Sequence, residues 1–143
     1  MDKSREYILM CGQAHEIQKL WGRSYGDFFV GENGRIECWI TERDQGRHIR
    51  RGFCIRVKDD LIQLARYVWL PRLNQLMELA QVAGQRFENT TLEFFDWTKS
   101  PYASGSDKPA TRFKSLEQLW LAYVMQRQFG KKWSGSEWTV VGG

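Results

Sequence analysis

The stretch DFFVGENGRIECWI, residues 27–40, predicts the fold more directly than any other segment of this chain. Asn33-Gly34 stands between two runs that contain aromatic and β-branched residues. Both residues tolerate the positive φ of a two-residue type I′ turn, so the pattern predicts a β-hairpin. In the register that such a turn imposes, Glu32 faces Arg35 across the first pair of the two strands, which is a favourable match of charges.

A third strand is predicted downstream of the hairpin. In residues 53–57, Phe, Ile and Val alternate with Cys and Arg, and a period of two is typical of a strand. The three strands together predict a small antiparallel sheet, with residues 41–52 as a long connection. Residues 60–68 are compatible with either a helix or a strand.

Helical periodicity is present on both sides of these strands. Ser4 can cap a helix that runs to about Trp21, and Pro71 suits the first turn of a second helix that Gly84 would end. The first helix has apolar residues at three- and four-residue steps, namely Tyr7, Met10, Cys11, Ala14, Ile17 and Trp21. The second helix has a shorter stripe of the same kind, namely Leu73, Leu76, Met77, Ala80 and Ala83.

The last third of the chain predicts one further helix and one ambiguous segment. Residues 90–97 begin like a capping box and predict a short helix, although their β-branched and aromatic content is also compatible with a strand. Ser115 and Gln118 form a second capping-box pair before a helix over 116–129, which Gly130 would end. This helix is apolar nearly all round from 116 to 125, so it is either central to the fold or half of a homodimer contact.

These elements, with a length of 143 residues, predict a single compact α+β domain over 1–143. Its small antiparallel sheet, built on the Asn33-Gly34 hairpin and a third strand, would pack against three or four helices. Hydrophobic residues make up 42% of the chain and aromatic residues 14%, which is ample for a core. Residues 98–112 contain two prolines and several small polar residues, and predict a flexible loop.

Charge and cysteine usage restrict the class of protein. The net charge of +4 permits contact with nucleic acid without requiring it. The three cysteines are widely spaced, which is typical of reduced thiols in a cytoplasm. The apolar run at 7–10 is too short for a signal-peptide core, and no apolar stretch is long enough to span a bilayer. We therefore expect a cytoplasmic protein that does not enter the membrane.

Several aromatic motifs resemble those of a known group of proteins. The strings are EYILMCGQAHEIQKLW, GDFF, WLPRLNQLMEL and SLEQLWLAYVMQRQFGKKWSGSEW, and they cover about half of the chain. They resemble small, uncharacterised proteins that are encoded in bacterial prophages. The shared motifs are aromatic and structural, so the resemblance implies a phage-related setting and no known activity.

The cysteine and histidine residues raise the question of a metal site. Cys11 and His15 stand one helical turn apart, a spacing that lets two side chains share a metal ion. His48, Cys54 and Cys38 could supply further ligands. The plainer interpretation is favoured, because Cys11 belongs to the apolar stripe and no pair has the close two-residue spacing of structural zinc sites. A Cys–His nucleophile would also need an orienting third group, to which nothing local points.

A basic cluster lies between the second and third predicted strands. Its members are Arg43, Arg47, His48, Arg50 and Arg51. Such a loop could lie along a phosphate backbone, with Trp39 and Phe53 at its base to stack on bases. The alternative is a solvated loop whose arginines keep the sheet edge from pairing with other chains.

Seven tryptophans run from one end of the chain to the other. Trp21 and Trp120 fall on helix stripes and are expected in the core. Trp133 and Trp138 follow the last helix in a tight Gly/Ser-rich turn, which predicts that their indoles lie close together. They either close the core or anchor a partner, and core closure is the favoured interpretation.

The sequence therefore favours a non-enzymatic accessory or binding protein that acts through contacts with a protein partner. The second hypothesis is a nucleic-acid-binding protein that uses the basic loop at 43–51. An enzyme with an unrecognised site comes third, because no catalytic residues, metal ligands or cofactor motif stand out.

Overall fold

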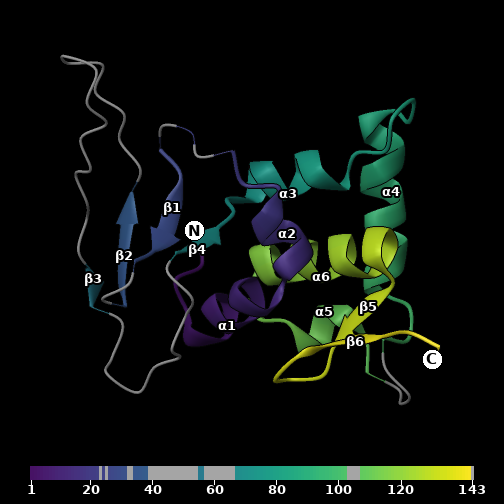
Figure 1. Ribbon diagram of the computed structural model, residues 1–143. Helices are drawn as coiled ribbons and strands as arrows, with labels where there is room; N and C mark the ends of the chain where they lie inside the picture. The colour runs from purple at the N-terminus through teal and green to yellow at the C-terminus, as the bar shows by residue number, and fades with distance from the viewer. Residues whose placement is uncertain are drawn as a thin grey trace. The chain divides into compact units, whose positions relative to one another are not determined.

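The computed structural model describes residues 1–22, 24, 26–31, 34–38, 55–56, 67–102 and 107–142. These residues form an α+β fold (Figure 1), as predicted. The chain divides into two compact units. We call Lys3–Arg72 the sheet unit, and Leu73–Gly143 together with Met1–Asp2 the helical unit.

The sheet unit contains an antiparallel sheet with the strand order β3-β2-β1-β4. Its strands are β1 (Phe28–Val30), β2 (Arg35–Cys38), β3 (Ile55–Arg56) and β4 (Val68–Leu70). The hairpin of β1 and β2 and the third strand, which pairs with β2, are therefore confirmed. Sequence analysis missed β4, which pairs with the other edge of β1. All three β4 residues are buried, and so short a continuous apolar run has no strand periodicity to reveal it.

The hairpin has a different register from the one predicted. The N–H of Gly31 donates to the carbonyl of Arg35 at 2.9 Å, and the N–H of Gly34 donates to the carbonyl of Gly31 at 3.0 Å. Gly31 therefore stands opposite Arg35, one residue out of the predicted register, while Glu32, which was predicted to face Arg35, lies outside the described residues. Gly34 has a φ of +71°, a left-handed conformation that glycine adopts at no steric cost.

Apolar pairing explains why this register is adopted. Val30 lies opposite Ile36, and each side chain is 1% exposed. A two-residue turn would shift the pairing by one residue and place Val30 opposite Glu37. Because a shift of one residue moves a strand's side chains to the other face, burial of the apolar pair outweighs the preference of Asn-Gly for a two-residue turn.

The predicted N-terminal helix is divided in two. Helix α1 covers Arg5–Gln13 and α2 covers His15–Lys19, with Ala14 at non-helical angles of φ −84° and ψ 69° between them. The cap is as predicted, since Ser4 Oγ accepts the N–H of Tyr7 at 3.2 Å. The predicted apolar stripe is buried from Tyr7 to Ile17.

The break in the helix coincides with a polar bridge to the sheet. Gln18 Nε2 donates to the carbonyl of Cys11 at 3.1 Å and to that of Trp69 at 3.0 Å, and Gln18 Oε1 accepts the N–H of Trp69 at 2.8 Å. One side chain therefore joins the end of α1 to both backbone groups of a β4 residue. These long-range hydrogen bonds form where the chain departs from a single straight helix.

The helical unit is organised around α6 (Leu116–Phe129), whose residues 120–125 are all buried. It contacts α3 (Leu73–Ala80), α4 (Phe87–Thr98) and β5 (Lys131–Trp133), and β5 pairs with β6 (Trp138–Val140) in a hairpin (Figure 1). The nearly all-round apolar pattern of this helix is therefore accounted for by its central place in its own unit. Its caps are as predicted, with Ser115 Oγ accepting the N–H of Gln118 at 3.1 Å and Gly130 left-handed at φ +63°.

The structure resolves the ambiguous segment at 90–97. It belongs to α4, which begins at Phe87 rather than at the predicted capping box. The predicted loop at 98–112 contains a short helix, α5 (Pro109–Arg112), and Tyr102 within it is 1% exposed. The Pro71 helix ends at Ala80, and Gly84 lies in a following turn at φ +83° instead of capping the helix.

Candidate functional site

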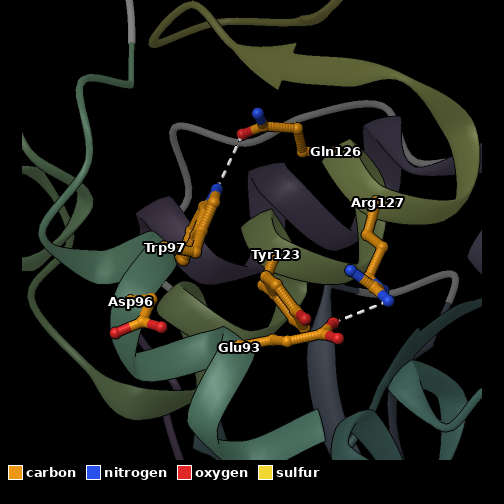
Figure 2. Close-up of a pocket in the computed structure, with 6 residues that line it drawn as sticks. All are labelled: Glu93, Asp96, Trp97, Tyr123, Gln126 and Arg127. Atoms are coloured by element: carbon orange, nitrogen blue, oxygen red, sulfur yellow. Dashed lines mark hydrogen bonds and ion pairs between the residues drawn. The ribbon is translucent and has the colours of Figure 1, made fainter. Parts of the chain in front are cut away.

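Helices α4 and α6 of the helical unit form a pocket of about 380 Å³ between them. Its six lining residues are shown in Figure 2, namely Glu93, Asp96, Trp97, Tyr123, Gln126 and Arg127. Each helix supplies three of them at positions i, i+3 and i+4, which lie on one helical face. The two helices therefore present matching polar and aromatic faces to the pocket.

Polar contacts join the two walls of the pocket. Trp97 Nε1 donates to Gln126 Oε1 at 2.8 Å, and the Arg127 guanidinium forms an ion pair with Glu93 at 2.6 Å between Nη2 and Oε2 (Figure 2). The other Glu93 oxygen accepts from Gln85 Nε2 at 2.7 Å. The side chains of Arg127 and Glu93 are 36% and 41% exposed, so their ion pair contributes orientation more than stability.

Tyr123 stands at the centre of the pocket wall. Its side chain is 3% exposed, and its hydroxyl lies toward the Glu93–Arg127 pair but makes a hydrogen bond of good geometry to neither (Figure 2). Burial raises the pKa of Tyr123, the Arg127 guanidinium lowers it, and the Glu93 carboxylate adds to the rise. The hydroxyl is therefore neutral at physiological pH and keeps a proton to donate.

An aromatic cluster holds the pocket wall rigid. The rings of Trp97 and Tyr123 are 5.3 Å apart at 59°, and Phe94 meets Tyr123 edge-on at 5.5 Å. Phe94 also stacks on Trp120 at 3.9 Å. Arg127 lies over the Tyr123 ring, 5.9 Å from its centroid. Because such ring contacts restrict side-chain rotation, the pocket is pre-organised.

The exposed side of α4 carries three large apolar side chains, with the exposed Glu88 among them at helical spacing. Phe87 is 51% exposed, Leu92 63% and Phe95 54%. Phe87 also lines a second pocket of about 390 Å³, together with Asn74, Met77, Glu78 and Gln81. We call Phe87, Leu92 and Phe95 the α4 face.

The two tryptophans predicted to contact a partner belong to the β5–β6 hairpin. Their rings are 5.1 Å apart, so the predicted proximity is confirmed. Trp133 is 2% exposed, its N–H donates to Tyr102 Oη at 2.7 Å and its carbonyl accepts from Arg112 at 2.9 Å. Trp138 is half-buried. The burial of Trp133 agrees with core closure, and a partner contact through either residue stays a prediction.

Cys11 and His15, the pair with metal-ligand spacing in the sequence, lie in different environments in the structure. Cys11 is fully buried and His15 is exposed on the far side of the helix break at Ala14. In the part of the chain that the structure describes, no group of three or more Cys, His, Asp or Glu side chains could hold a metal ion. His48 and Cys54 lie outside that part, as does the whole basic cluster: Arg43, Arg47, His48, Arg50 and Arg51.

Sequence reasoning missed the pocket between α4 and α6. The signal was present as polar and aromatic residues at helical spacing, 93, 96 and 97 in one segment and 123, 126 and 127 in the other. The β-branched and aromatic content of 90–97 is compatible with either a helix or a strand, so the sequence does not fix the helical face that carries 93, 96 and 97. The pairing of the two segments also depends on tertiary packing.

Fold and site together define an α+β protein with a pre-organised polar pocket walled by aromatic rings. No family model, curated protein or solved structure matches the chain. Among the helices of the described residues, none has both the length and the apolar character needed to cross a membrane.

Proposed function

We propose that the protein is a non-enzymatic accessory module that binds a protein partner, in the phage-related setting implied by its sequence motifs. The observation that carries this proposal is the α4 face, on which three large apolar side chains are each more than half exposed. Large exposed apolar side chains with polar neighbours are typical of a protein contact surface.

The interior of the helical unit supports the same proposal. α4 buries Phe94 against Trp120, so the helix is held firmly while its outer side chains face solvent. Large aromatic side chains that are presented from a rigid helix lose little entropy on binding, which is the usual character of interface anchors. The pocket beside Phe87 offers room for a side chain of the partner.

The test is partner capture with tagged full-length protein expressed in its native bacterial host. Leu92→Ser and Phe95→Ser should each reduce recovery of a nuclease-resistant protein partner by about tenfold or more. Val140→Ser is the matched control, because Val140 is 68% exposed but lies on β6, and it should leave recovery unchanged.

Two outcomes would contradict the proposal. One is equal recovery by wild type and both α4 variants, which would remove the α4 face as the contact surface. The other is recovery that nuclease abolishes, which would favour nucleic-acid binding through the basic cluster at 43–51 instead.

A further inference from the structure

We propose that the pocket between α4 and α6 receives a neutral planar amide group, whose carbonyl oxygen accepts a hydrogen bond from Tyr123. The starting observation is that this hydroxyl is buried beside Glu93 and Arg127 but makes a hydrogen bond of good geometry to no described residue. Buried polar groups in proteins are nearly always paired, and an unpaired one is costly. A hydroxyl that lines a pocket in this state is therefore placed for a group that enters the pocket.

The neighbouring polar groups are also donors. Trp97 Nε1 can only donate, so its hydrogen bond fixes the Gln126 amide with Oε1 toward Trp97 and leaves the N–H groups of Nε2 for a ligand. Arg127 uses Nη2 for Glu93 and keeps further N–H groups. Three donor-bearing side chains, Tyr123, Gln126 and Arg127, therefore line one pocket. The chemistry that satisfies them is an acceptor oxygen.

The charges of the pocket favour a neutral ligand. Glu93 neutralises Arg127, and the Asp96 carboxylate at the rim adds a negative charge, which disfavours a carboxylate or phosphate. A cationic ligand would find the face of the Tyr123 ring already taken by Arg127. The rings of Trp97 and Tyr123 offer flat walls. A planar amide meets all of these conditions.

Such an amide has two sources, the side chain of Gln or Asn on a protein partner, or a free small amide. A Gln or Asn side chain of a partner rests on the proposed function, since the partner would insert this side chain beside the α4 face. A free small amide does not depend on the proposed function. Binding of a small amide probe and capture of a partner are separate measurements, so either idea can fail without the other.

The test is an NMR titration of the protein with propionamide, whose only polar group is one planar amide. We expect saturable shifts of the Trp97 indole and Gln126 amide resonances, and weaker binding of propionate and of propylammonium. Tyr123→Phe removes only the hydroxyl and should weaken amide binding about fivefold. Its melting temperature should be equal to or above that of wild type, because it removes a buried hydroxyl that makes no hydrogen bond of good geometry.

Tyr102→Phe is the matched control. Tyr102 Oη is paired with the Trp133 N–H and does not line the pocket, so this variant should melt at a lower temperature and bind the amide as wild type does. A loss of partner capture by Tyr123→Phe assigns the amide to the partner, and unchanged capture assigns it to a free ligand. Equal amide binding by wild type and Tyr123→Phe, or tighter binding of either charged probe, overturns the inference.

Discussion

Tyr102 shows how one buried hydroxyl contributes to the helical unit. Its ring is 1% exposed, meets Phe113 edge-on at 5.3 Å, and has Lys132 and Arg112 near its face. Its oxygen accepts a hydrogen bond from the Trp133 N–H, a buried backbone donor of β5. Burial raises the pKa of Tyr102 to about 12, although the Trp133 N–H and the Arg112 charge act to lower it.

This pKa predicts a loss of stability at high pH. Between about pH 10 and about 12 the unfolded chain loses the Tyr102 proton while the folded protein keeps it, so unfolding releases a proton. The contribution is fully present below about pH 10 and falls as pH rises, by about 2–3 kcal/mol in total. Urea unfolding of wild type and Tyr102→Phe at several pH values measures it. The same pH dependence in both proteins would contradict the assignment.

At the scale of elements, the sequence correctly predicted the helix N-caps, which depend on residues within one turn. Ser4 and Ser115 accept N–H groups of the first turns of α1 and α6, as their sequence context predicts. The sequence predicted less where packing against another helix or strand determines the register or the secondary structure. The Asn33-Gly34 hairpin forms, but pairing of Val30 with Ile36 sets its register. Residues 90–97 form a helix because Phe94 packs against Trp120 and Tyr123 of α6.

The cap of α6 yields a quantitative prediction. Ser115→Ala leaves the Gln118 N–H without its acceptor and removes the bond that Ser115 donates to Asp2 at 2.5 Å. We expect the free energy of unfolding to fall by about 1–2 kcal/mol. Ser115→Thr keeps a capping hydroxyl and should retain most of that stability. Thermal and urea unfolding of both variants tests this, and an equal loss in both would show that the cap is not the cause.

At the scale of the whole molecule, the sequence predicted one compact domain, and the described residues form two compact units. The sheet unit contains the hairpin and α1, while the helical unit contains the pocket and the α4 face. The α+β class follows from the hairpin and helix signals taken together. The basic cluster at 43–51 lies outside the described residues and stays a prediction from the sequence.

That cluster is testable on the intact protein. If it binds nucleic acid, replacing Arg47, Arg50 and Arg51 by Ala should abolish binding of a fluorescent DNA or RNA oligonucleotide and reduce the slope of log K against log salt by about three. Fluorescence anisotropy over a salt series measures both. Absence of wild-type binding at low salt would end the hypothesis.

The sequence alone determined the helix caps at Ser4 and Ser115, the buried stripe of α1, the Asn33-Gly34 hairpin and the proximity of Trp133 to Trp138. These features depend on neighbours within a few residues, so local propensity and periodicity encode them. Only the tertiary structure decided the hairpin register, the break at Ala14, strand β4, and the pocket that joins residues 93–97 to 123–127. Each depends on hydrogen bonds or packing between segments distant in sequence, and the energy of those contacts outweighs local preference.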